Sequence, residues 1–150
     1  MLDLFPISTT NEELVFRAIL KENKLPFQDL DFERFAYFLV KNKQNETVGT
    51  AAYERYEDVA LLRSIAVIDA FKNKGFGKII IEKIEQSAKN EAITHFYLLT
   101  TTANLFFQKQ NYYLCDRKDV PEAVLKSTEF SSVCPSSAIC LIKKLGNKKP

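Results

Sequence analysis

Residues 60–92 read ALLRSIAVIDAFKNKGFGKIIIEKIEQSAKNEA, and the pattern of this stretch changes twice. Residues 60–67 are an almost unbroken apolar run, which predicts a strand buried on both faces. Residues 69–77 are polar and contain glycine, which is typical of a loop. From residue 79 to residue 92 the apolar side chains follow a helical period. The apolar stripe consists of Ile80, Ile81, Ile84 and Ala88, and the opposite polar face of Glu82, Lys83, Glu85 and Gln86.

A further short strand is expected at residues 96–100, after this helix. A strand, a helix and a second strand in this order form a βαβ unit, whose two strands lie parallel. Before residue 60, polar turns separate strand-like segments, which predicts antiparallel hairpins. The fold class is therefore α+β with a mixed sheet. A first helix is expected to start at a Thr-x-x-Glu capping box within residues 9–13, to bury Leu14, Val15, Ala18 and Ile19, and to stop near Pro26. A later helix is expected at 103–110 with Thr102 as its N-cap, and a helical turn at 119–127. The other expected strands are at 34–41, 47–54, 112–115 and 138–144.

The composition describes an ordinary globular chain. Its 150 residues suit one domain, and a chain of this size buries roughly two-thirds of its unfolded surface. With 46% hydrophobic and 27% charged residues, disordered and low-complexity classes are excluded. The net charge of +2 argues against a dedicated nucleic-acid or membrane-surface binder. We expect a single domain over residues 1–150 with a frayed basic tail at 146–150, and solvated lysines at Lys143, Lys144, Lys148 and Lys149.

The cysteines give no sign of a metal or disulfide framework. Cys115, Cys134 and Cys140 are an odd number, and neither a Cys-x-x-Cys pair nor a histidine cluster accompanies them. No metal site is therefore expected, and a reducing cytoplasm is the expected location. The N-terminus lacks the basic and apolar regions of a signal peptide, and no apolar run reaches the roughly 20 residues that span a bilayer.

Residues 71–78, FKNKGFGK, are the candidate ligand loop. The unpaired N–H groups at the start of a helix suit a phosphate, and Gly75 and Gly77 let the main chain approach it closely. Lys72, Lys74 and Lys78 add positive charge. The same residues also fit a glycine-containing turn with solvated lysines, and taken alone they do not decide between the two interpretations.

The strand, loop and helix together resemble the central motif of the GNAT (GCN5-related) N-acetyltransferase superfamily, Arg/Gln-x-x-Gly-x-Gly/Ala. Lys72 stands at the Arg/Gln position, and Gly75 and Gly77 stand at the small positions. Residues 103–112, ANLFFQKQNY, are similar to the second signature of the family, A-x-x-F-Y-x-x-x-G-F. The two resemblances cover most of residues 47–115.

The resemblance implies a GNAT fold, which is a mixed, twisted central sheet flanked by helices on both faces, and acetyl-CoA as the cosubstrate. It also implies that the parallel strands splay apart to admit the pantetheine arm, and that acetyl transfer to an amine is direct, through a ternary complex. Homodimers through the C-terminal strands are an option in this family. The residues that the resemblance places at acetyl-CoA are Ile65, Ala66, Val67, Lys72, Asn73, Lys74, Gly75, Phe76, Gly77, Lys78, Asn104 and Phe107.

Two positions depart from the family pattern. Asn111 replaces a glycine, which is a mild change because asparagine tolerates the left-handed conformation. Phe107 replaces a tyrosine whose hydroxyl protonates the departing thiolate in many members. Residues 128–138, TEFSSVCPSSA, are similar to acetyltransferases encoded with bacterial arsenic-resistance genes. That resemblance implies a small amine or an amino-acid-like acceptor.

Glu54 and Arg63 are the candidate acceptor-site residues. Arg63 shares a strand face with apolar side chains, so it must be paired or lie at a cleft. In one interpretation the two residues form a structural ion pair. In the other, Glu54 takes the acceptor's ammonium proton, directly or through water, and Arg63 binds an acceptor carboxylate. Thr100 and Thr101 are expected to line the acceptor pocket, although threonines are also ordinary at a strand end.

Three other functions remain open at this stage. The missing hydroxyl at Phe107 fits an acyl-CoA-binding module without catalysis. The three cysteines could converge on a trivalent metalloid, although Cys134 is more simply a structural residue, as is His95. A nucleic-acid binder is disfavoured by the net charge.

Overall fold

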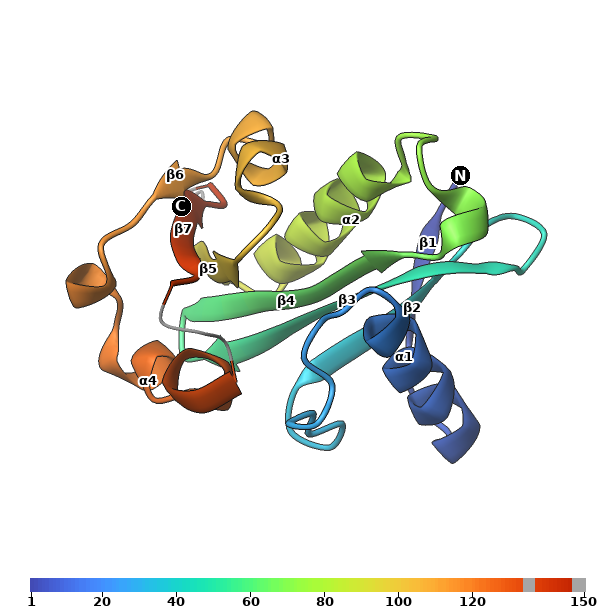
Figure 1. The fold of residues 1–150 in the computed structure, drawn as a ribbon, viewed down its shortest axis with the longest axis horizontal. Helices are drawn as coiled ribbons and strands as arrows, with labels where there is room; N and C mark the ends of the chain where they lie inside the picture. The colour runs from blue at the N-terminus through green and yellow to red at the C-terminus, as the bar shows by residue number, and fades with distance from the viewer. Residues whose placement is uncertain (134–136, 147–150) are drawn as a thin grey trace.

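The structure is a computed structural model that describes residues 1–133 and 137–146. Its centre is a mixed sheet with the strand order β1-β2-β3-β4-β5-β7-β6 (Figure 1). Only the β4–β5 pair is parallel within this part of the chain, as predicted from the βαβ pattern. The strands are β1 (Asp3–Pro6), β2 (Ala36–Lys41), β3 (Thr47–Tyr56), β4 (Val59–Val67), β5 (His95–Thr100), β6 (Tyr113–Leu114) and β7 (Ile139–Lys144).

Helices cover both faces of the sheet. Figure 1 shows α2 and α3 on one side and α1 and α4 on the other, and the buried clusters agree with this arrangement. The α-helices are α1 (Thr10–Glu22), α2 (Phe76–Asn90), α3 (Asn104–Lys109) and α4 (Glu122–Leu125). Two short 3-10 helices are η1 (Asp69–Phe71) and η2 (Arg117–Asp119), and a π-helical turn is η3 (Glu129–Val133). The expected α+β class and flanking helices are confirmed.

The start of α1 forms the predicted capping box. The Thr9 hydroxyl accepts a hydrogen bond from the Glu12 N–H at 3.1 Å, and the Glu12 carboxylate accepts from the Thr9 N–H. The predicted buried face is only partly right, because Leu14 is 60% exposed and Ala18 is exposed. The buried side chains are Phe16, Ile19 and Leu20, which share one face at i, i+3 and i+4.

Several other expectations need correction. β1 was not foreseen, because a four-residue edge strand carries too little periodicity to detect. α3 has Ala103 rather than Thr102 as its N-cap, without a side-chain hydrogen bond. The Ala103 N–H donates instead to the Thr100 hydroxyl at 2.9 Å. Asn111 has a φ of 73°, so the predicted left-handed conformation after α3 is confirmed.

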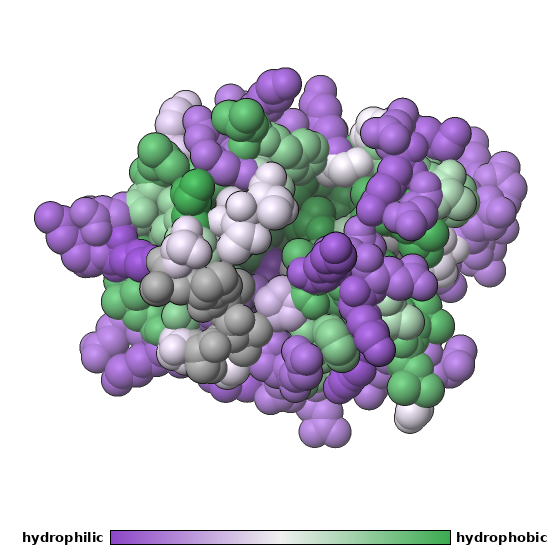
Figure 2. Space-filling model, in the orientation of Figure 1, coloured by the Kyte–Doolittle hydropathy of each residue, from purple (hydrophilic) through white to green (hydrophobic). Residues whose placement is uncertain are grey.

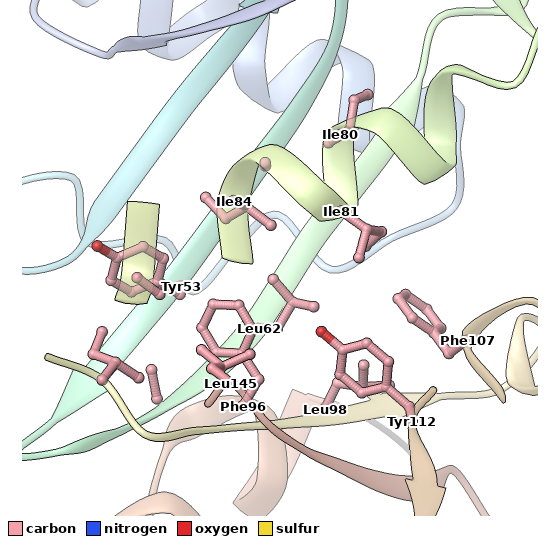
Figure 3. Packing of buried hydrophobic residues seen from close by; sticks show 14 of the residues in the cluster. Tyr53, Leu62, Ile80, Ile81, Ile84, Phe96, Leu98, Phe107, Tyr112 and Leu145 are labelled. Atoms are coloured by element: carbon pink, nitrogen blue, oxygen red, sulfur yellow. The ribbon is translucent and has the colours of Figure 1, made fainter. Parts of the chain in front are cut away.

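The larger core lies between α2 and the sheet. Ile80, Ile81 and Ile84 of α2 pack over Leu62 and Phe96, and the predicted apolar stripe is fully buried (Figure 3). Each isoleucine buried in this way contributes about 2 kcal/mol relative to an exposed side chain. The stripe therefore fixes α2, and with it the loop that precedes α2, against the sheet.

Glu85 also faces the sheet, contrary to its expected place on the polar face of the helix. The Lys143 ammonium lies 2.9 Å and 3.0 Å from the two Glu85 oxygens, and the Tyr112 hydroxyl donates to Glu85 at 2.8 Å. Lys143 is thus not the solvated tail lysine that we predicted. β7 pairs with β5 and places Lys143 next to Glu85. Lys144 is exposed, and Lys148 and Lys149 lie outside the described residues.

Replacement of Glu85 by alanine should therefore destabilise the protein. The Lys143 ammonium would lose its carboxylate and keep only the Gln110 carbonyl, and the Tyr112 hydroxyl would lose its acceptor, which together costs about 2 kcal/mol. Glu82→Ala is the matched control, because Glu82 is exposed on the same helix. Urea unfolding of the two variants should show a lower midpoint for Glu85→Ala alone. Equal midpoints for the two variants would contradict the assignment.

Candidate active site

β4 and β5 pair only over their first three residues. The parallel ladder joins Val59–Leu61 to His95–Tyr97 and stops there, although β4 continues to Val67 and β5 to Thr100. The predicted splay is therefore present. A pocket of about 430 Å³ occupies the opening, which we call the gap pocket, and Figure 2 shows hydrophobic residues within a hollow on this face. Its walls are Leu62, Arg63, Ser64 and Ile65 of β4, Leu98 and Leu99 of β5, Thr101, Ala103, Phe107, Glu129, and residues 21 and 24–28.

A bulge in β4 lies just beyond the point where the ladder between β4 and β5 ends. Thr50 is opposite Ala66 and Ala52 is opposite Arg63, so β4 carries one extra residue there. Ser64 has a φ of 61°, and its carbonyl accepts a hydrogen bond from the Thr50 hydroxyl at 2.7 Å. The Ser64 hydroxyl is buried in the wall of the gap pocket, without a hydrogen-bond partner among the described residues. Sequence reasoning missed this residue.

The predicted phosphate loop forms a second hollow of about 390 Å³ beside the gap pocket. Gly75, with a φ of 80°, is the N-cap of α2, so the free N–H groups of the first turn open into this hollow. Ile65 lines both hollows, so the two adjoin at this residue. The structure brings together the predicted residues Ile65, Ala66, Val67, Lys72, Asn73, Gly75, Phe76, Gly77 and Lys78, and it leaves Lys74 outside the lining.

Within the loop hollow, space and charge are restricted. A Cβ atom on Gly77 would lie 3.3 Å from the Phe106 ring, so any side chain there competes with the wall of the hollow. Lys72, at the Arg/Gln position of the motif, pairs with Asp69 of η1 at 2.9 Å. This exposed pair contributes little to stability and leaves the lysine free to exchange partners.

Arg63 is the centre of a buried ion cluster, with only 1% of its side chain exposed. Its guanidinium donates to both oxygens of Asp29, at 2.6 Å and 2.8 Å, and to Glu54 at 3.0 Å. The Glu129 carboxylate lies 3.7 Å from its Nε. Burial opposes the charge of Arg63, but the three carboxylates raise its pKa and keep it charged. The fork that we expected to hold an acceptor carboxylate is thus occupied by Asp29.

Glu54 is buried, and both of its oxygens have partners. One accepts from Arg63 and the other from the Tyr56 hydroxyl at 2.7 Å. Burial, together with this carboxylate, raises the pKa of Tyr56. Glu54 does not line the gap pocket; it lines a separate hollow with Asp29 and Tyr56. Of the two interpretations of Glu54 and Arg63, the ion pair is the one whose geometry is present.

Glu129 is a residue that sequence reasoning passed over. It lies in η3, it is 4% exposed, and it lines the gap pocket. Its Oε1 atom is buried without a hydrogen-bond partner among the described residues. Burial raises the pKa of Glu129 to about 7, although the nearby Arg63 lowers it. The sequence signal for Glu129 is its place as the one carboxylate in the stretch 128–138.

The other predicted site residues divide into two groups. Thr101 and Phe107 line the gap pocket, and Phe107 stacks edge-on against Phe106 and Tyr112. Thr100 accepts the Ala103 N–H and does not line the pocket. Asn104 lines neither hollow, and its side chain accepts from Gln108 at 2.7 Å.

The thiols form no metal site in the described part of the chain. No group of three or more His, Cys, Asp or Glu side chains there could hold a metal ion. Cys115 donates its N–H to the Cys140 carbonyl, and burial raises the pKa of the Cys140 thiol to about 12. Cys134 lies outside the described residues. Within those residues, no helix has the length and apolar character needed to cross a bilayer.

Comparison with known proteins agrees with this geometry. An uncharacterized N-acetyltransferase of Chlorobaculum tepidum is 27% identical over 72% of this chain and 68% of its own length. The amino-acid acetyltransferase of Pasteurella multocida is 28% identical over 81% of this chain, which spans only 27% of that protein. An N-acetylglutamate synthase from Neisseria gonorrhoeae, solved with coenzyme A and N-acetyl-glutamate, has a TM-score of 0.78 at 14% identity, over 98% of this chain and 36% of the synthase.

The model of the acetyltransferase (GNAT) family matches residues 5–113, which is most of the chain. This match includes the splayed strands, the bulge and the glycine loop of α2. Acetyl-CoA is the cosubstrate of this family, in accord with the predicted cofactor. The chain belongs to the GNAT acetyltransferase family and is an acyltransferase.

Proposed function

We propose that this enzyme transfers the acetyl group of acetyl-CoA directly to the amino group of a small, amino-acid-like molecule. The observation that carries the proposal is that the hollow at the N-terminus of α2 and the gap pocket between β4 and β5 adjoin at Ile65. The pyrophosphate would bind at α2, the pantetheine arm would follow β4, and the thioester would lie in the gap pocket. Catalysis then comes mainly from holding the two reactants together.

The charges around the gap pocket support an acceptor with an amino group and an anionic group. The carboxylates of the Arg63 cluster outnumber its one cation, so the inner end of the pocket favours an ammonium group. Lys21 and Lys24 line the same pocket and are exposed, so they can face a carboxylate. The likeness to amino-acid acetyltransferases supports this choice. The pocket volume of about 430 Å³, which the end of the pantetheine arm must share, favours a small acceptor.

We assign Arg63 and Asp29 a positioning role in this reaction. Asp29 holds the guanidinium by two hydrogen bonds, and Arg63 in turn holds Glu54 and faces Glu129. Glu54 remains a candidate base, to be compared with Glu129 below. Phe107 offers no proton to the thiolate. The link to arsenic resistance and the homodimer through the C-terminal strands both stay predictions.

Replacement of Gly77 by glutamate should abolish acetyl-CoA binding. The new side chain would meet Phe106 and would place a negative charge at the helix N-terminus, where the pyrophosphate belongs. Calorimetric titration should give micromolar binding to the wild type and none to the variant. Gln86→Glu is the control, because Gln86 is exposed on the same helix and the added charge is equal.

The same titration separates the alternatives. A folded wild type that fails to bind acetyl-CoA would contradict the proposal. If acetyl-CoA binds, release of the free thiol is measured with the twenty amino acids and a set of small primary amines. Tight binding without turnover on any of them would identify an acyl-CoA-binding module instead.

Replacement of Asp29 by alanine should lower stability by about 2 kcal/mol, because a buried guanidinium would lose its two-point partner. Asp31→Ala is the control, since Asp31 lies in the same segment and its side chain is exposed. Urea unfolding should show a lower midpoint for Asp29→Ala only. If Asp29→Ala unfolds with the wild type, Asp29 is not what holds Arg63.

A further inference from the structure

The carboxylate oxygens around Arg63 differ in whether they accept a hydrogen bond. Both Asp29 oxygens accept hydrogen bonds from Arg63. Both Glu54 oxygens also have partners, Arg63 and Tyr56. Glu129 Oε2 faces Arg63 at 3.7 Å, and Oε1 has no hydrogen-bond partner among the described residues. Within the cluster, the unused acceptor atom therefore belongs to Glu129.

The position of Glu129 explains what could donate a hydrogen bond to this free acceptor atom. Glu129 lines the gap pocket together with Ile65, Leu98 and Phe107, whereas Asp29 and Glu54 line the hollow behind the cluster. A buried carboxylate oxygen without a partner costs several kcal/mol unless something satisfies it. A hydrogen-bond donor bound in the gap pocket would do so, and the donor that a carboxylate binds best is a cation.

We propose that Glu129 binds the ammonium group of the acceptor in the gap pocket and accepts its proton. This assignment rests on the proposed function and names the group that the acceptor must present there, a primary ammonium. It also moves the role of base from Glu54, on β3, to a residue of the segment before β7.

The chemistry balances with Glu129 as the base. The acceptor R–NH3+ passes one proton to the Glu129 carboxylate and becomes R–NH2. The amine lone pair attacks the thioester carbon and forms the C–N bond. The C–S bond then breaks, and its electron pair leaves on the CoA sulfur. The second nitrogen proton goes to that sulfur, so the products are the acetamide, the CoA thiol and protonated Glu129, which returns its proton to water.

The surroundings of Glu129 suit a proton acceptor that acts near neutral pH. Burial raises its pKa to about 7, Arg63 lowers it, and the charges of Glu54 and Asp29 raise it further. Among the described residues, Lys21 and Lys24 are the other charged groups that line the gap pocket. General bases work best when their pKa lies near the working pH. The rate should therefore rise with pH through about 7 as Glu129 loses its proton.

The first test needs no identified acceptor. The protein carries 13C in its glutamate carboxyl groups and is loaded with coenzyme A, and ethylammonium is the probe, with ethanol as the neutral control of equal size. In the 13C NMR spectrum, the Glu129 carboxyl signal is identified by its absence from the spectrum of Glu129→Gln. In the wild type this signal should shift saturably with ethylammonium and not with ethanol. A signal that ignores ethylammonium would overturn the proposal, as would a response at the signal missing from Glu54→Gln.

The second test uses the fastest acceptor from the amino-acid and amine screen. Glu129→Gln should lower kcat/KM by roughly 10²-fold or more and should lose the rise in rate with pH. It should still bind acetyl-CoA, because the pyrophosphate would be held at the loop hollow, which Glu129 does not line. If the rise persists in Glu129→Gln and disappears in Glu54→Gln, Glu54 is the base and the proposal fails. A wild type that does not bind acetyl-CoA would remove the proposed function itself, together with this inference.

Discussion

The buried guanidinium of Arg63 is the constraint on which the site depends. A charge that is almost fully removed from water is tolerated only when good partners surround it. Here the partners come from three separate parts of the chain: the segment after α1, strand β3, and η3. Arg63 lies between the apolar cluster under α1 and the one under α4, on the same face of the sheet. The need to neutralise one side chain thus draws the N-terminal and C-terminal segments to the same point, where β4 and β5 begin to part.

The opening between β4 and β5 is built from backbone rather than from side chains. Each strand keeps an antiparallel partner on its outer side, β3 for β4 and β7 for β5, so the sheet survives the loss of the inner ladder. The bulge at Ser64 lies just beyond the end of that ladder and bends β4 there. Beyond Leu61 and Tyr97 no parallel ladder uses the backbone N–H and C=O groups between the two strands, so such groups are available to an amide-bearing ligand. A pantetheine arm carries such amides, and this is the physical reason why the fold suits the cosubstrate.

Local sequence patterns predicted the fold well, but they did not predict pairs of side chains that are far apart in the sequence. The helical stripe of α2, the capping box at Thr9 and the glycine loop each lie within a few consecutive residues, so their physics can be recognised in the sequence alone. Asp29 lies 34 residues from Arg63 and Lys143 lies 58 residues from Glu85, and no periodicity encodes these two pairs. Glu85 in particular follows Ile84 on the flank of the apolar stripe, where only a distant lysine decides whether a carboxylate can be buried. Glu54 could be predicted as a neighbour of Arg63 because the two residues lie close together in the sequence, whereas Asp29 and Glu129 lie far from Arg63 and were not predicted.

Glu129 also connects acceptor binding to the balance of charge in the cluster. One guanidinium cannot neutralise three carboxylates. Arg63 makes two hydrogen bonds to Asp29 and one to Glu54, so Glu129, at 3.7 Å, receives the least of its positive charge. A neutral group in the gap pocket would leave that deficit of positive charge unchanged and an anionic group would enlarge it, whereas an ammonium group would supply the missing positive charge. Selectivity for an amine then follows from the incomplete neutralisation of the buried cluster, without a dedicated recognition loop. The same deficit makes the bound ammonium give up its proton, because the transfer leaves a neutral carboxylic acid and a neutral amine where two buried charges stood.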